Sequence, residues 1–181
     1  MVNLENEHES YRSFFSDNEY KQRIKMEDSR NRIGLKLPEN RVGASKKVIN
    51  IFDSLLSIFP KREFYFYMQI MPQNYNPSYF IHTKDFTAVM QIRLAGGSAI
   101  PYLSNLSKKY ETLIEIEGIH SFKKGVGKDL VNSLKEVSNH TKAPIYLFDN
   151  NLKDENYYQN LGFVNSHSKG YGEEPLLVYL P

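Results

Sequence analysis

Two glycines stand between an apolar run and a helical pattern, at a point where backbone amides could bind a phosphate group. Residues 113–119 are apolar and strand-like, and Gly125 and Gly127 follow them. From Val126 onward, apolar residues recur at helical spacing. The first amides of a helix have no acceptor within it, and the helix dipole adds partial positive charge there. Because glycine has no Cβ atom, a phosphate could approach this backbone closely. The stretch predicts a strand, a phosphate-binding turn and a helix.

Two other phosphate-binding patterns are excluded by the residues around this turn. The P-loop needs Ser or Thr after its Lys and a Gly five residues before its last Gly. Here Asp129 follows Lys128, and Phe122 stands at the position of that Gly. The dinucleotide-binding fingerprint needs a third Gly three residues after the second, where this chain has Leu130. The turn is therefore either a phosphate site built from backbone amides or a tight loop without a ligand.

Composition limits the kinds of protein that this chain can be. Its 181 residues suffice for one domain with a substantial core, and 13 Tyr and 11 Phe predict that this core is rich in aromatic rings. The net charge of +2 is too small to indicate a nucleic-acid partner or a membrane surface. No apolar run approaches the roughly 18 residues of a membrane span. We therefore expect neither a membrane nor a nucleic acid as a partner.

The sequence contains no cysteine, and its histidines are scattered. Disulfides, thiolate catalysis and cysteine-ligated metals are thereby excluded. No two histidines have a metal-ligand spacing such as His-x-x-x-His, so no metal site is predicted. Residues 1–9 are polar and acidic and lack the apolar region of a secretory signal. These features fit a cytoplasmic protein.

The apolar pattern predicts an α+β protein with a mixed, mostly antiparallel sheet flanked by helices. Residues 1–31 would be a polar N-terminal extension, helical or partly disordered, whose aromatic residues are compatible with a homodimer. Residues 32–181 would form the main domain. Helices are predicted at 44–59, 126–139 and 152–160, and strands at 33–37, 63–71, 79–82, 86–94, 110–119, 144–148, 163–164 and 176–180. Residues 98–109 have no clear pattern.

A second motif follows the strand predicted at 144–148. Residues 157–163 read Tyr-Tyr-Gln-Asn-Leu-Gly-Phe, and Asn151 stands seven residues before Tyr158. Together with the glycine turn, this motif makes residues 110–165 resemble the GNAT superfamily of N-acetyltransferases. Both glycines of the turn match the family pattern, whereas Phe122 stands where the family usually has Gln or Arg.

The resemblance implies a donor substrate and a way of binding it. The donor would be acetyl-CoA or another acyl-CoA, with its pyrophosphate at the turn and its pantetheine arm along a strand that splays from its neighbour. Backbone amides of the turn would bind the pyrophosphate, and lysines would add charge. The cofactor-binding residues implied in this way are Ile119, Lys124, Gly125, Val126, Gly127, Lys128, Asn151 and Tyr158. Asn151 would also cap the helix at 152–160.

The resemblance also implies direct attack of a primary amine on the thioester. Such attack needs a base for the amine proton and a proton for the departing thiolate. Tyr158 is the candidate for the thiolate; the alternative is a ring that only packs on the sheet, as we expect for Tyr157. Glu115 and Glu117 are candidates for the base, because residues two apart on a strand point to one side, toward either a substrate or solvent. His120 is a third candidate, with a plain surface histidine as the alternative.

The function predicted is acyl-CoA-dependent N-acetyl transfer to an amine that the sequence does not identify. A fold relative that has lost catalysis and serves as a CoA-binding or protein-interaction module is the alternative, which Phe122 supports. A plain α+β interaction protein would require both motifs to occur in the right order by coincidence. Tight CoA binding without turnover would favour the inactive module.

Overall fold

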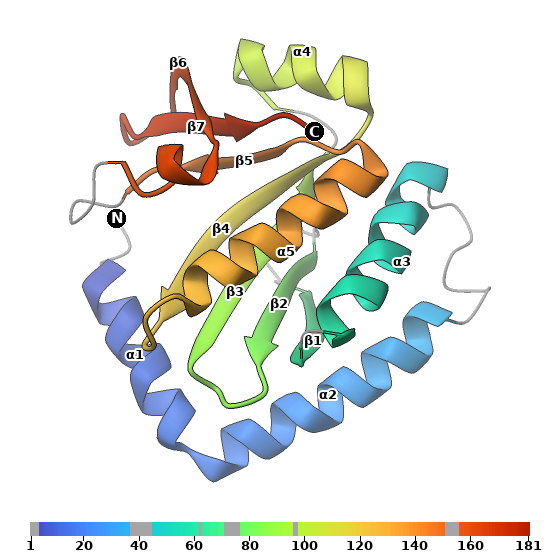
Figure 1. Ribbon diagram of the computed structural model, residues 1–181, viewed down its shortest axis with the longest axis vertical. Coiled ribbons are helices and arrows are strands. Elements are labelled where there is room, and N and C mark those ends of the chain that lie inside the picture. Colours follow the sequence, from blue (N-terminus) through green and yellow to red (C-terminus); the bar gives the residue numbers. More distant parts are fainter. Residues whose placement is uncertain (1–3, 37–44, 62, 71–76, 96–97, 151–155) are drawn as a thin grey trace.

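A seven-stranded sheet with helices on both faces forms the protein (Figure 1). The computed structural model describes residues 4–36, 45–61, 63–70, 77–95, 98–150 and 156–181. Its helices are α1 (Leu4–Ser16), α2 (Asn18–Lys36), α3 (Lys46–Lys61), α4 (Pro101–Tyr110), α5 (Val126–Thr141) and the short 3₁₀ helix η2 (Gln159–Leu161). Its strands are β1 (Phe64–Ile70), β2 (Pro77–Thr83), β3 (Ala88–Ala95), β4 (Leu113–Ser121), β5 (Ile145–Phe148), β6 (Val164–Lys169) and β7 (Pro175–Tyr179).

The strands lie in the order β1-β2-β3-β4-β5-β7-β6. Every neighbouring pair is antiparallel except β4 and β5, which are parallel and are joined by the crossover helix α5. The predicted α+β class with a mixed, mostly antiparallel sheet is confirmed. The parallel pair lies in the middle of the sheet, and the glycine turn lies between β4 and α5.

Helices α3 and α5 lie side by side over one face of the sheet (Figure 1). Their buried stripes, which include Ile51 and Leu55 on α3 and Leu130 and Leu134 on α5, pack with Met90 and other strand residues in the largest hydrophobic cluster. Helix α3 begins at Lys46, two residues after the predicted start at 44, and the Val48 amide donates to the Ser45 hydroxyl at 3.2 Å. It ends at Lys61, two residues beyond the predicted end at 59.

Helices α1 and α2 cover part of the opposite face. Phe15 from α1 and Tyr20 and Ile24 from α2 form a cluster with Phe80 and Val89. The residues next to Phe80 and Val89 in the chain belong to the core under α3 and α5, so Phe80 and Val89 point to the opposite face of the sheet. Ile24 is 1% exposed, and burying a side chain of this size contributes roughly 1.5–3 kcal/mol. The N-terminal extension is therefore helical and packed on the sheet. Phe14 is 45% exposed, and a homodimer stays a prediction.

Four predictions of secondary structure are wrong. One is the helix at 152–160, whose described part is a turn at 156–158 followed by η2. Residues 33–36 belong to α2, because Gly34 weakens a helix without ending it, and the first strong stop is Pro38. The predicted division at residue 31 thus falls inside α2, and a separate role for residues 1–31 stays a prediction. Residues 101–110 form α4, which begins with Pro101 and buries Leu103. As a result β4 begins only at Leu113.

His82 lies under α2 at the centre of the aromatic cluster. Its Nε2 atom is 3.3 Å from the Tyr20 hydroxyl, and the residue is 0% exposed. Burial disfavours the charged imidazolium and lowers the pKa of His82 from 6.5 to about 3. Because the unfolded chain takes up a proton that the folded protein excludes, the free energy of unfolding falls as the pH drops through this window.

We predict that acidification from pH 6.5 toward pH 3 destabilises the protein, with His82 contributing about 1.4 kcal/mol per pH unit. His82→Gln removes this titration and flattens the pH dependence, as measured by urea unfolding at a series of pH values. His140→Gln, a change at an exposed histidine of α5, is the matched control and should keep the original slope. Equal slopes for His82→Gln and the unaltered protein would contradict the assignment.

Candidate active site

The turn before α5 leaves two backbone amides without an acceptor among the described residues. Gly125 has φ of 90°, in the left-handed region that glycine tolerates, and it lies just before the helix. The Val126 amide donates to the Lys123 carbonyl at 3.3 Å, so it is engaged within the turn. Among the described residues, no group accepts a hydrogen bond from the amides of Gly127 and Lys128. Of the predicted amide donors, these two are the candidates for binding an anion, and Lys128 is exposed whereas Gly127 is buried.

Gly127 is where the turn meets β4 and the residues before η2. A Cβ atom at this position would lie 3.3 Å from the Tyr157 hydroxyl, 3.4 Å from the Ser121 Cβ atom and 3.8 Å from a methyl of Ile119. The structure thus brings the predicted residues Ile119 and Gly127 together. Tyr157 was expected only to pack in the core. Its ring does pack against the core, but its hydroxyl reaches the turn, which the sequence did not indicate.

The parallel strands β4 and β5 are paired over only two residue pairs, Ile114 with Ile145 and Glu115 with Tyr146. Strand β4 continues for six more residues to Ser121, so its edge beyond Glu115 is free of β5. The register with β3 shifts at Glu117, which forms a β-bulge. Glu117 is an exposed residue although its side chain is only 21% exposed, so its main chain is accessible. An extended ligand with amide groups could add to this edge.

Arg93 of β3 joins the two predicted base candidates. Its Nε and one terminal nitrogen donate to a Glu115 oxygen at 3.0 and 2.6 Å, and the other terminal nitrogen lies 3.5 Å from Glu117. The Tyr146 hydroxyl donates to the same Glu115 oxygen at 2.9 Å. Burial and the neighbouring Glu115 carboxylate both raise the pKa of Tyr146 well above its usual value. Glu115 is 9% exposed at its side chain and has three donors, which makes it a structural ion-pair partner rather than a base.

Glu117 is held differently from Glu115. One of its oxygens accepts from the Ser78 hydroxyl at 2.7 Å and from the Gln91 amide at 3.0 Å. The other oxygen has the longer contact with Arg93 at 3.5 Å. As predicted, both glutamates lie on one side of β4, since the same guanidinium reaches both. Of the two, Glu117 is the carboxylate that a substrate can reach.

His120 does not face a substrate. Its Nδ1 atom lies 3.1 Å from Nδ1 of His8, and its Nε2 atom lies 3.5 Å from a Glu7 carboxylate oxygen. Tyr11 stacks on its ring with centroids 4.7 Å apart. Burial lowers the pKa of His120, which the charge of Glu7 partly opposes. Both ring nitrogens are directed to α1, so His120 links the extension to β4 and is no longer a candidate base.

Tyr158 lies beyond the end of β5, on the side of the α5 core. Its ring packs against Phe163 and Tyr157, with centroids 5.8 and 5.0 Å apart, and its carbonyl accepts from the Phe163 amide. Burial, with smaller effects from Tyr157 and Asp149, raises the pKa of the Tyr158 phenol. The phenol therefore stays protonated at neutral pH, as a proton donor must. Asn151 and the first part of its predicted helix lie outside the described residues.

Phe122, which departs from the family pattern, packs against α1. Its ring centroid lies 4.4 Å from that of His8 and 5.5 Å from that of Phe15. Lys123 pairs with Asp85 at 3.6 Å, whereas Lys124 and Lys128 are exposed. The turn therefore presents two lysines, and the aromatic side chain at 122 is an anchor for the extension.

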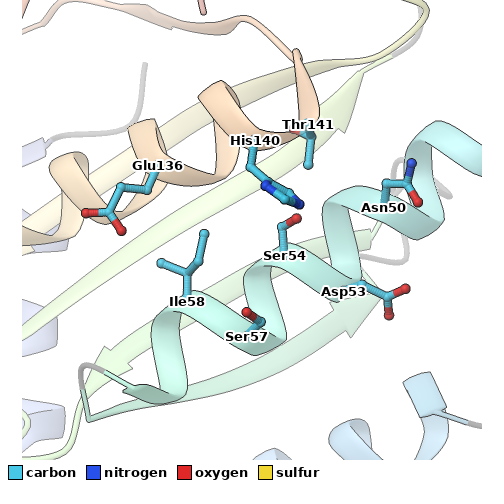
Figure 2. A pocket seen from close by; sticks show the side chains of 8 residues that line it. All are labelled: Asn50, Asp53, Ser54, Ser57, Ile58, Glu136, His140 and Thr141. Carbon is cyan, nitrogen blue, oxygen red and sulfur yellow. The ribbon is translucent and has the colours of Figure 1, made fainter.

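A hollow among the described residues lies elsewhere, between α3 and α5 (Figure 2). It measures about 680 Å³ and is lined mainly by polar side chains: Asn50, Asp53, Ser54, Ser57, Ile58, Glu136, His140 and Thr141. It shares no residue with the glycine turn and lies at the opposite end of α5. We therefore place the candidate site at the turn and the β4 edge, not in this hollow.

Part of the chain is similar in structure to an N-acetyltransferase. The match is the Bacillus subtilis N-acetyltransferase YlbP protein in complex with coenzyme A, with a TM-score of 0.42 and 19% sequence identity. The match covers 59% of this chain and 68% of that one. No protein-family model matches the sequence, and no curated protein is significantly similar to it. At this distance the likeness does not assign an activity.

Within the described ranges, no three His, Asp or Glu side chains are grouped so that they could hold a metal ion. No helix in the same ranges has the length and apolar character needed to cross a membrane.

We predict that Arg93→Met lowers the free energy of unfolding by about 2–4 kcal/mol, because it leaves Glu115 buried without its charged partner. Urea unfolding measures the change. Glu117→Gln is the comparison variant and should cost less than about 1 kcal/mol, since Gln keeps acceptors for Ser78 and Gln91. The double variant Arg93→Met/Glu115→Met should recover most of the loss. Equal losses for Arg93→Met and Glu117→Gln would contradict the central role of the Arg93–Glu115 pair.

Proposed function

We propose that the protein is an N-acetyltransferase that moves an acetyl group from acetyl-CoA to a primary amine. The observation that carries this proposal is the free edge of β4, which is followed by a turn where the amides of Gly127 and Lys128 have no acceptor among the described residues. An edge strand followed by a helix start suits a ligand that has amide groups at one end and phosphates at the other. Acyl-CoA has this construction, with a pantetheine arm and a pyrophosphate.

Each residue at the turn has its own role in binding acetyl-CoA. Gly127 and Lys128 donate their amides to the pyrophosphate, and Gly125 provides the left-handed turn before them. Lys124 and Lys128 add positive charge from exposed positions. Ile119 lines the approach beside Gly127, and the Tyr157 hydroxyl is a further donor at the same place. Asn151 is kept as a proposed ligand of the pantetheine or the acceptor, because it follows β5 closely in sequence.

The reaction needs a base that takes a proton from the amine and an acid that gives a proton to the departing thiolate. Glu117 accepts a proton from the acceptor ammonium, directly or through a water, so that the amine nitrogen can attack the thioester carbonyl. The new N–C bond forms as the C–S bond breaks, and Tyr158 donates its phenolic proton to the departing thiolate. The attacking nitrogen loses its second proton as the amide forms, and this proton restores the Tyr158 phenol. Glu115 acts through Arg93, which it fixes beside Glu117. No covalent enzyme intermediate is required, which is compatible with a sequence that lacks cysteine.

We predict that acetyl-CoA and CoA bind with micromolar affinity in calorimetric titration and that Gly127→Asp weakens binding at least 100-fold. The added carboxylate would stand in the phosphate site and repel the pyrophosphate. Gly127→Ala separates the effect of size from that of charge, and Asn139→Asp places the same charge near the other end of α5. We expect Asn139→Asp to bind acetyl-CoA and CoA with the affinity of the wild type. A folded wild-type protein that binds neither ligand would refute the proposed donor site.

We predict that Glu117→Gln and Tyr158→Phe each lower kcat by about 100-fold or more while leaving the affinity for CoA within a few-fold of wild type. Thiol release in the presence of a panel of primary amines measures turnover. Donor binding without turnover on any amine would favour the alternative, a CoA-binding module without catalysis.

A further inference from the structure

Arg12 of α1 lies over the residue that leads into the glycine turn. Its guanidinium carbon is 5.2 Å from the centroid of the Phe122 ring, a cation–π distance. Phe122 is in turn fixed by Phe15, which is buried, and by His8. The sequence separates Arg12 from the turn by more than a hundred residues, so only the packing of α1 on β4 brings this charge to the site.

The other contact of Arg12 is weak and replaceable. Its Nε atom lies 3.5 Å from a Glu9 carboxylate oxygen, and both side chains are 64% exposed. A pair as exposed as this one contributes little to stability, so its donors can pass to a better acceptor at little cost. A phosphate is such an acceptor, because the guanidinium can form two parallel hydrogen bonds with it.

The turn itself has fewer free cations than its sequence indicates. Lys123 is paired with Asp85, which leaves Lys124 and Lys128 as the other lysines of the turn. CoA carries three phosphate groups, two in the pyrophosphate and one on the ribose. Two amides and two lysines suit the pyrophosphate, and the third phosphate still needs a cation.

We propose that Arg12 binds a phosphate group of CoA, so that α1 forms one wall of the donor site. This inference rests on the proposed function and adds to it a specificity-determining residue from the N-terminal extension. Binding of CoA then fastens α1 to the end of β4 through Arg12. The extension becomes part of the donor site instead of an appendage to it.

The test compares two arginines that have the same kind of contact. Arg23 of α2 lies over the Tyr20 ring with its guanidinium carbon 5.4 Å from the centroid, but Tyr20 belongs to α2 and not to the strand before the turn. Arg12→Ala, Arg12→Lys and Arg23→Ala are titrated with CoA and with dephospho-CoA at two salt concentrations. Far-UV circular dichroism shows whether each variant keeps its helices.

We expect Arg12→Ala to weaken CoA binding at least fivefold and to reduce its dependence on salt, Arg12→Lys to have an intermediate effect, and Arg23→Ala to bind within twofold of wild type. If Arg12→Ala loses affinity for CoA but not for dephospho-CoA, Arg12 binds the ribose phosphate. If it loses affinity equally for both ligands, Arg12 binds the pyrophosphate. Hydrogen exchange gives a second readout: CoA should protect residues 4–16 in the wild type and less in Arg12→Ala.

Wild-type affinity of a folded Arg12→Ala would overturn the role of Arg12 and leave the proposed function intact. If Arg12→Ala lost helix content, CoA-dependent protection of α1 in the wild type would still decide, because no protection would mean no contact between α1 and the ligand. Failure of the wild type to bind CoA would refute the proposed function itself. The two failures are therefore distinguishable.

Discussion

Only two residue pairs join β4 to β5, and the candidate site depends on this short pairing. If the strands had paired over the whole of β4, its backbone groups would be satisfied within the sheet and could not bind a ligand. The crossover helix α5 must return the chain from the end of β4 to the start of β5, so its first turn lies next to the free edge. The topology of the sheet thus places the free edge of β4 next to the start of α5. The two glycines at this point leave the backbone without Cβ atoms, so a ligand can approach it closely.

The ion pair between Arg93 and Glu115 stabilises the same junction from the other face of the sheet. Arg93 is paired with Glu115 in the β3–β4 register, two residues before the shift at Glu117, and Tyr146 of β5 donates to the same carboxylate. Three strands are therefore tied together at the last point where β4 and β5 are paired. Because the pair is well satisfied there, β4 can leave β5 immediately afterwards without exposing an unpaired charge.

The local part of this arrangement could be predicted from the sequence. Gly125, Gly127 and the helical period from Val126 are contiguous, and a turn followed by an amphipathic helix needs no knowledge of distant residues. Glu115 and Glu117 were correctly placed on one side of a strand. Their different roles could not be predicted, because these depend on Arg93 and Tyr146, which the sheet register brings to Glu115.

The wrong predictions also have physical reasons. Residues 33–36 alternate as a strand would, but a four-residue pattern is too short to outweigh the helix that precedes it. Helix α4 was missed because Leu103, Leu106 and Tyr110 are spread thinly among polar residues, and their partners Leu113 and Tyr146 lie on strands whose order the sequence does not give. Tyr157 and Tyr158 are adjacent and chemically alike, so only the fold shows which hydroxyl meets Gly127.

Phe122 shows how one substitution can be interpreted in two ways. By motif alone it is a missing polar side chain and favours a site that has lost its function. In the structure its ring is held among Phe15 and His8, and a longer polar side chain there would have to leave the aromatic cluster that fixes α1. An aromatic ring can keep α1 in place and hold the guanidinium of Arg12 on its face at the same time. The ring at position 122 and the packed extension are therefore parts of one arrangement, in which Arg12 of α1 lies at the end of β4.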